Sequence, residues 1–283
     1  MKIKRLLTLA AIALLVVTAC APTPAPTAAV TKKAPTVVST PKPAATVAPT
    51  QVPNPTVVPA TPAAITSTQP AGTVYAPVID PAKFVTRIDN PYFPLQPGRT
   101  FVYEGKTEVG NEHDEVYVSR DTKVIVGVTC VVVTDTVTVD GKLEELTIDW
   151  YAQDKQGNVW YFGEDAKAYD KDNVISTHGS WEAGVNGAKP GIVMPVNPQP
   201  GDPYRQEYYK GEAEDMAQVL RVTGSISVPY GSYTNVLITK EWSAIEPQLV
   251  IENKYYARGV GFILSKVIEG GSGDLRLVAI RND

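Results

Sequence analysis

The sequence predicts one all-β domain, a strongly curved antiparallel sheet that forms a half-barrel or barrel, preceded by a disordered linker. After residue 75, β-branched and aromatic runs alternate with turn dipeptides about every ten residues, and helical periodicity is almost absent. About a dozen consecutive antiparallel strands must curl, split into two layers or close. Residues 1–74 hold 12 of the 24 prolines and no Asp, Glu, Trp, Tyr or Phe. The folded domain is therefore expected at residues 75–283, and a single core suffices for that length.

Residues 1–19 predict a secretory signal peptide, with a basic start, a short apolar run and a small-residue end. The apolar run is too short to span a bilayer comfortably. Val17-Thr18-Ala19-Cys20 resembles the lipobox of bacterial lipoproteins. That resemblance implies cleavage before Cys20, a diacylglycerol on its sulfur and, in many bacteria, a further acyl chain such as palmitate, which together give stable anchoring. The expected location is the cell membrane, with the domain on the extracytoplasmic side. The alternative is an ordinary secreted protein in which Cys20 is incidental.

Residues 20–74 form the predicted linker, built mostly from Pro, Thr, Ala and Val. Prolines every few residues prevent a helix, and the segment has no aromatic cluster to bury. In a polyproline-like conformation it would extend on the order of 150 Å, which suits a tether. A proline-rich recognition ligand and a carrier of O-linked sugars are the alternatives.

The strands of the domain are predicted in order from their β-branched and aromatic runs. Turns are expected at Asp140-Gly141, where both residues tolerate positive φ, and at Asp154–Asn158 and Asp170–Asn173. The composition of Glu212–Leu220 would also suit a short helix. The expected strands are Phe101–Glu104, Glu115–Ser119, Lys123–Val126, Thr129–Val139, Leu143–Ala152, Val159–Phe162, Ala166–Tyr169, Val174–Thr177, Arg205–Tyr209, Val219–Val228, Asn235–Trp242, Leu249–Tyr256, Gly261–Ile268 and Leu275–Ile280.

The segment Gly184–Pro203 interrupts this rhythm with five prolines and four glycines. A loop of this length inside a compact domain is more often functional than accidental, and we expect it to cover the sheet. Aromatic residues around it predict a ligand site, with one Arg as a polar anchor. The predicted ligand-binding residues are Trp160, Trp181, Met194, Arg205, Tyr208 and Tyr209.

Charge argues against nucleic acid as a partner. Residues 75–283 carry all 30 acidic residues and 20 of the 26 Lys and Arg, so their formal charge is -10. A net-acidic domain without a basic stripe lacks the electrostatic footprint of phosphate binding. Cys130 lies in a β-branched run and is expected to be a small core residue rather than a reactive thiol.

The sequence contains no recognisable catalytic constellation, so we expect a non-enzymatic domain without a cofactor. His113 and His178 are the only histidines, and HExxH, GxSxG, P-loop and paired-cysteine motifs are absent. Alternatives are a triad of His178, Ser180 and a distant Asp, or a glycosidase-type carboxylate pair. Most of the acids are expected in solvated turns.

Calcium is an alternative ligand, because oxygen-rich loops suit a hard cation. The candidate ligands Asp165, Asp170 and Asp172 lie close together in the sequence, but they lack the alternating spacing of an EF-hand. A metal is therefore a weak expectation.

Several motifs resemble those of an uncharacterised set of bacterial extracytoplasmic β-domains. Asn90–Tyr103 opens with Asn-Pro-Tyr-Phe-Pro-Leu-x-Pro-Gly, the aromatic turn that precedes the first strand in that family. The likeness continues in DWYAQD at Asp149–Asp154, GNVWYF at Gly157–Phe162, VPYGSY at Val228–Tyr233 and YYAxGVG at Tyr255–Gly261. It implies a family without an agreed activity, and it transfers no catalytic residue.

Together these observations predict a lipid-anchored extracytoplasmic domain that binds an apolar or carbohydrate ligand at the cell envelope. Aromatic side chains on a curved sheet suit such ligands. The alternatives are a structural or protein-interaction module of the envelope, with an exposed strand edge for an envelope protein, and a calcium-binding surface domain.

Overall fold

The computed structural model describes residues 75–282, except 171–172, 202 and 247–249. The predicted signal peptide, Cys20 and the tether lie outside the described residues. The described part contains sixteen β-strands and one short 3-10 helix, η2 at Pro81–Lys83, and no α-helix. Within this part of the chain, no helix has the length and apolar character needed to cross a membrane.

The strands follow one another with short connections. In chain order they are β1 (Phe84–Val85), β2 (Arg99–Thr107), β3 (Asn111–Ile125), β4 (Val128–Val139), β5 (Lys142–Asp154), β6 (Val159–Asp170), β7 (Asn173–Ser176), β8 (Trp181–Glu182), β9 (Lys189–Met194), β10 (Tyr204–Arg205), β11 (Glu207–Tyr208), β12 (Asp215–Val228), β13 (Gly231–Ser243), β14 (Ile251–Ala257), β15 (Gly261–Glu269) and β16 (Gly273–Asn282).

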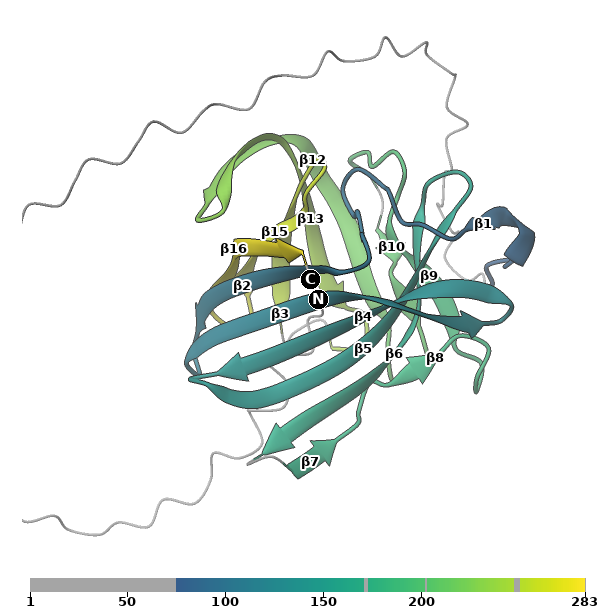
Figure 1. Ribbon diagram of the computed structural model, residues 1–283, viewed down its shortest axis with the longest axis horizontal. Coiled ribbons are helices and arrows are strands. Elements are labelled where there is room, and N and C mark those ends of the chain that lie inside the picture. The colour runs from purple at the N-terminus through teal and green to yellow at the C-terminus, as the bar shows by residue number, and fades with distance from the viewer. Residues whose placement is uncertain (1–74, 171–172, 202, 247–249, 283) are drawn as a thin grey trace, which may run out of the picture. The chain divides into compact units, whose positions relative to one another are not determined.

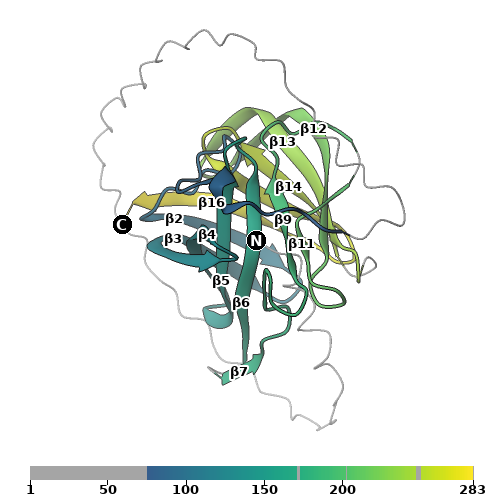
Figure 2. The same cartoon turned by 90° about the vertical axis from the view of Figure 1, so that its right-hand side faces the viewer.

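These sixteen strands form a single antiparallel sheet, in which thirteen follow the order β10-β12-β13-β14-β15-β16-β2-β3-β4-β5-β6-β9-β11. Off this path, β1 pairs with β5, and both β7 and β8 pair with β6. Figure 1 shows β2–β6 side by side as one wall, with β16 beside β2 and with β12, β13 and β15 behind. Figure 2 shows the two walls on opposite sides, with β9 and β11 between them. The predicted all-β, strongly curved and barrel-like antiparallel sheet is confirmed.

Two junctions bring the walls together. At the first junction, β16 pairs with β2 over their whole length, from Gly273 opposite Thr107 to Asn282 opposite Arg99. At the second, the strands at the two ends of the sheet are consecutive in the chain, because only Gln206 separates β10 from β11. Since β10 pairs with β12 and β11 pairs with β9, this short segment nearly closes the barrel.

The predicted turn at Asp140-Gly141 is confirmed, with φ values of 48° and 78° that suit a tight hairpin. Several predicted strands are parts of longer ones. The two runs on either side of Arg120 join into β3, and those on either side of Gly163 join into β6, each across a register shift in its pairing. Such bulges let a strand bend around a barrel without ending.

Two expectations need correction. The segment Gly184–Pro203 does not simply lie across the sheet, because its residues 189–194 form β9 and pair with β6 and β11. Gly191 makes this pairing possible: a Cβ there would lie 2.4 Å from the carbonyl carbon of Gln206. The open helical alternative at Glu212–Leu220 is also excluded, since β12 begins at Asp215.

The hydrophobic core fills the barrel from both walls and extends under β1 and β8. Cys130 belongs to this core and is fully buried, as predicted. Burial raises the pKa of its thiol to about 12, so the thiolate is not available at neutral pH. Part of the interior, however, is hollow, and buried polar groups line it together with apolar side chains.

Candidate functional site

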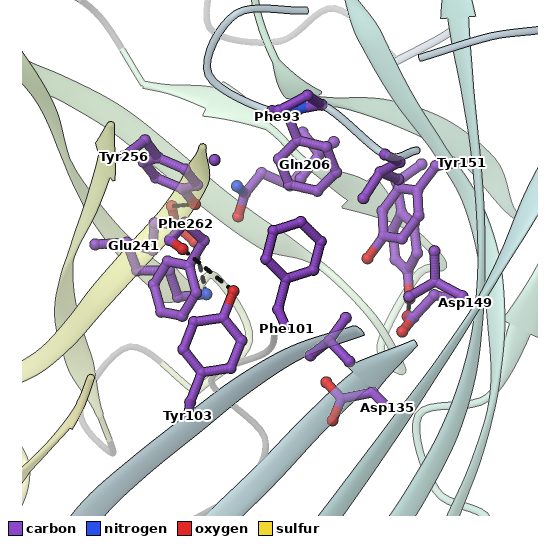
Figure 3. A pocket seen from close by; sticks show the side chains of 18 of the residues that line it. Phe93, Phe101, Tyr103, Asp135, Asp149, Tyr151, Gln206, Glu241, Tyr256 and Phe262 are labelled. Atoms are coloured by element: carbon purple, nitrogen blue, oxygen red, sulfur yellow. Dashed lines mark hydrogen bonds and ion pairs between the residues drawn. The ribbon is translucent and has the colours of Figure 1, made fainter. Parts of the chain in front are cut away.

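The barrel contains a cavity with a volume of about 80 Å³. A single water molecule needs roughly 10–15 Å³ of cavity volume, so this cavity has room for several waters or one small molecule. Strands of both walls contribute side chains to it (Figure 3). One end is lined by Phe93, Pro94 and Leu95 from the loop before β2 and by Val260 and Gly261 at the β14–β15 turn.

Aromatic rings form much of the cavity wall. On one side Tyr151 and Tyr161 stack at a centroid distance of 4.8 Å, and Phe93 packs on Tyr151 at 5.4 Å. On the other side the ring of Phe262 packs against two tyrosine rings, with centroid distances of 5.1 Å to Tyr103 and 5.8 Å to Tyr256. The aromatic lining residues are Phe93, Phe101, Tyr103, Tyr151, Tyr161, Tyr256 and Phe262.

Carboxyl groups from five strands also line the cavity, and all of them are buried. Strand alternation carries them inward: Asp135 on β4 is opposite Val116, and Asp149 on β5 is opposite Val133. Buried carboxylates are rare unless they are paired or hydrogen-bonded. The five are Asp135, Asp149, Glu207, Asp215 and Glu241, and in the described part of the chain Lys254 is the one basic residue that lines the cavity.

Glu241 and Lys254 form a buried ion pair at one side of the cavity, with 2.9 Å between Oε2 and Nζ. The hydroxyl groups of Thr239 and Tyr256 donate to Oε1 of Glu241 at 2.7 and 3.0 Å. Burial alone would raise the pKa of Glu241, but the Lys254 charge and these hydrogen bonds lower it below its ordinary value. Burial opposes the charge on Lys254 as well, yet Glu241 and Glu252 raise its pKa. The pair is therefore ionised at neutral pH.

Two further carboxylates receive hydrogen bonds from aromatic side chains. The Tyr161 hydroxyl donates to Oδ1 of Asp149 at 2.5 Å, and the Trp181 ring N–H donates to Oε2 of Glu207 at 2.9 Å. The rings of Tyr161 and Trp181 pack edge to face, 5.3 Å apart. Burial, followed by the negative charge of Asp149, raises the pKa of Tyr161, which keeps the phenol protonated as a donor. These contacts fix the positions of both carboxylates.

The loop before β2 is held over one end of the cavity by specific hydrogen bonds. The Gln153 side-chain oxygen accepts from the Asn90 backbone N–H at 2.8 Å, and the Asn90 amide donates to the Gly157 carbonyl at 2.8 Å. The Gly259 N–H donates to the Pro91 carbonyl at 2.7 Å. Four of the motif segments on which the family resemblance depends therefore meet at this end of the barrel.

None of the six residues predicted to bind a ligand lines the cavity. The Trp160 ring N–H donates to Asp154 at 2.9 Å, and the ring packs against Phe84 of β1. Trp181 is buried behind Tyr161, and Met194 is a fully buried core residue.

The other three predicted residues lie in or next to Tyr204–Tyr208, the segment of β10 and β11 that nearly closes the barrel. Arg205 forms an ion pair with Glu214 at 3.0 Å, and its guanidinium lies over the Tyr208 ring at 4.9 Å. Tyr208 in turn packs against Tyr75 with 5.6 Å between the ring centroids. Tyr209 is partly buried and packs against the core. Ligand binding by these six residues remains a prediction.

The calcium candidates do not converge in the described structure. Asp165 forms an ion pair with Lys167 at 2.7 Å, Asp170 is exposed at the end of β6, and Asp172 lies outside the described residues. Among the described His, Cys, Asp and Glu residues, no group of three or more could hold a metal ion.

The cavity carboxylates were missed because the acids were expected in solvated turns. Their sequence signal is an acid that takes an inward position of an alternating strand. Val133, Asp135 and Val137 follow this pattern on β4, and Thr239, Glu241 and Ser243 follow it on β13. All six side chains are buried.

No family model matches the chain, and no curated protein matches it. The family resemblance seen in the motifs is thus not confirmed by these searches.

Two solved structures are similar. One, from Bacteroides fragilis, is described as a "putative exported protein with YmcC-like fold"; it is 16% identical, with a TM-score of 0.40. The other, from Parabacteroides distasonis, is described as a "putative lipoprotein"; it is 11% identical, with a TM-score of 0.36. Each similarity covers 67% of this chain and 98% of the other chain.

Proposed function

We propose that this protein is a lipid-anchored, extracytoplasmic binding domain that holds a small ligand inside its barrel without acting on it chemically. The observation that carries the proposal is the interior cavity, in which aromatic rings and buried polar groups converge. A concave site with a mainly apolar wall and a few well-placed polar groups is the usual form of a small-molecule site. A barrel that served only as a scaffold would gain stability by filling this space with apolar side chains.

The size of the cavity limits the ligand. A volume of about 80 Å³ is small compared with roughly 300–1,000 Å³ for typical sites of drug-sized molecules. This favours a compact ligand over a lipid or an oligosaccharide. Three lining residues are only half-buried: Phe93 in the loop before β2, Val193 on β9 and Val260 at the β14–β15 turn. Their partial exposure supports entry of a ligand from that end of the barrel.

Mass spectrometry of the purified full chain tests the proposal. We expect native spectra and aqueous–organic extracts to reveal a stoichiometric small molecule. Val116→Phe should remove it, because Val116 lines the cavity from β3 and a larger ring would fill the space. Val124→Phe is the matched control, since it makes the same change on the same strand at a side chain that is 66% exposed.

The proposal fails if wild type, Val116→Phe and Val124→Phe are all empty and none responds in thermal unfolding to lipid, sugar and amine panels. The domain would then be better explained as a structural or protein-interaction module of the envelope.

The anchor is tested separately, because it depends on the lipobox at Cys20. The intact mass of full chain purified from bacterial membranes should correspond to loss of residues 1–19 and addition of acyl groups. Cys20→Ala should keep its signal peptide and carry no acyl group. An unmodified wild-type protein in the culture medium would contradict anchoring.

A further inference from the structure

We infer that the ligand of the barrel cavity is a small organic cation, such as a primary ammonium group on a short apolar body. This inference rests on the proposed binding function and specifies its ligand class.

Acidic side chains outnumber basic ones in the cavity lining. Five carboxyl groups line it together with one ammonium group, Lys254, which forms an ion pair with Glu241. The hydrogen bonds described above that Asp149 and Glu207 accept come from an uncharged phenol and an uncharged indole. Buried like charges raise one another's energy, so a bound cation would gain electrostatic energy at this site.

The aromatic rings favour the same class of ligand. In the view of Figure 3, Phe101 lies between the group of Tyr103 and Glu241 on one side and Asp135 and Asp149 on the other. An ammonium ion over the face of a ring is attracted by the ring quadrupole, most strongly where water is excluded. The rings also bury the apolar part of an organic ligand, which an inorganic cation does not have.

A bare metal ion fits less well. The lining carboxylates come from opposite walls of the barrel, Asp135 and Asp149 from β4 and β5 and Asp215 and Glu241 from β12 and β13. Among the described residues, no three His, Cys, Asp or Glu side chains are placed so that they could hold one metal ion. An organic cation can bridge such walls with its own hydrogen bonds. Charge outside the cavity assists, because a formal charge of -10 on residues 75–283 attracts cations to the domain.

The test compares three probes of nearly equal size and different charge: n-butylammonium, 1-butanol and butyrate. Each is titrated at millimolar concentration into the full chain by calorimetry, and thermal unfolding is followed in parallel. We expect n-butylammonium to bind about tenfold more tightly than 1-butanol, because hydrogen bonds to charged groups exceed neutral ones by about that factor. Butyrate should bind most weakly.

Variants link the charge preference to the cavity. Asp135→Asn and Asp149→Asn should each reduce the affinity for n-butylammonium about tenfold and leave 1-butanol unchanged. Glu104→Gln is the control, because it removes a carboxylate from the outer face of β2, where that side chain is 64% exposed. Circular dichroism verifies folding. If one Asp variant does not fold, the other variant still tests the charge preference. In addition, calorimetry of wild type in two buffers with different ionisation heats shows whether binding of n-butylammonium releases protons from carboxyl groups.

The outcomes separate the two proposals. Preference for n-butylammonium that the Asp variants abolish and Glu104→Gln retains supports the inference. Equal binding of 1-butanol and n-butylammonium, blocked by Val116→Phe, overturns the cation inference and leaves the binding function standing. A charge preference that survives in both Asp variants also overturns the inference. Lack of any probe binding, together with empty extracts, overturns both proposals.

Discussion

Breaking the buried ion pair of Glu241 and Lys254 should strongly destabilise the domain. Lys254→Met removes the ammonium that lies 2.9 Å from the Glu241 carboxylate, and the two side chains are only 4% and 2% exposed. Leaving one charge of a buried pair without its partner costs about 3–5 kcal/mol. Hydrogen bonds from Thr239 and Tyr256 to Glu241 remain, so we expect a loss near the lower end, about 3 kcal/mol.

The assay is urea unfolding of the full chain, followed by tryptophan fluorescence. It compares Lys254→Met, Glu241→Gln and the variant that carries both substitutions. In Glu241→Gln/Lys254→Met the uncompensated charge is gone, so the loss should fall short of the sum of the single losses by about 0.5–3 kcal/mol. The control is Arg281→Met, which breaks an ion pair with Glu115 of the same 2.9 Å length at exposed side chains. Such a surface pair contributes only about 0–1 kcal/mol.

Two results would refute this reasoning. One is a loss for Lys254→Met no larger than that for Arg281→Met. The other is a double variant whose loss equals the sum of the single losses, since the two charges would then not be coupled in the folded state.

Acidification from about pH 7 to about pH 3 should lower the urea midpoint of wild type more than that of Glu241→Gln. The pKa of Glu241 is lower in the folded protein than its ordinary value of 4.5. The ionised Glu241 therefore stabilises the fold above that ordinary value, and this stability is lost as the pH falls through the folded pKa. Cys130 should resist iodoacetamide at neutral pH until urea unfolds the chain, and fast labelling of the native protein would contradict its burial. Gly191→Ala should lower the free energy of unfolding by about 1–3 kcal/mol, because the new methyl group would collide with the Gln206 backbone. An unchanged urea midpoint would contradict this prediction, since the backbone at Gln206 would then move aside without cost.

The fold class could be predicted because its signals are local. Alternation of apolar and polar residues, and turn pairs such as Asp140-Gly141, depend on a few neighbouring residues and so appear in the sequence. Strand ends at bulges were not predictable in the same way. Ser119-Arg120-Asp121 resembles a turn, yet β3 continues through it because the partner strand β4 supplies pairing on both sides of the irregularity.

The cavity was beyond prediction from the sequence for a different reason. Its lining combines single residues from strands that are distant in the chain, such as Tyr103, Asp149 and Glu241. Whether an aromatic residue on a strand faces the interior depends on register, and a register shift reverses the side it faces. Trp160 and Tyr161 illustrate this: they are neighbours on β6, and only Tyr161 lines the cavity.

The pairing of β16 with β2 has a consequence for the kinetics of folding. Hairpins such as β3–β4 and β12–β13 join strands that are adjacent in the chain and can form early. By contrast, Arg281 and Glu115 meet beside the pairing of β16 with β2 although they are 166 positions apart. Contacts of such sequence separation form slowly, because loop-closure entropy is lost before they are made. The two walls can thus assemble as separate meanders. The interior becomes enclosed only when β16, the last strand of the chain, pairs with β2, the first strand of the other wall.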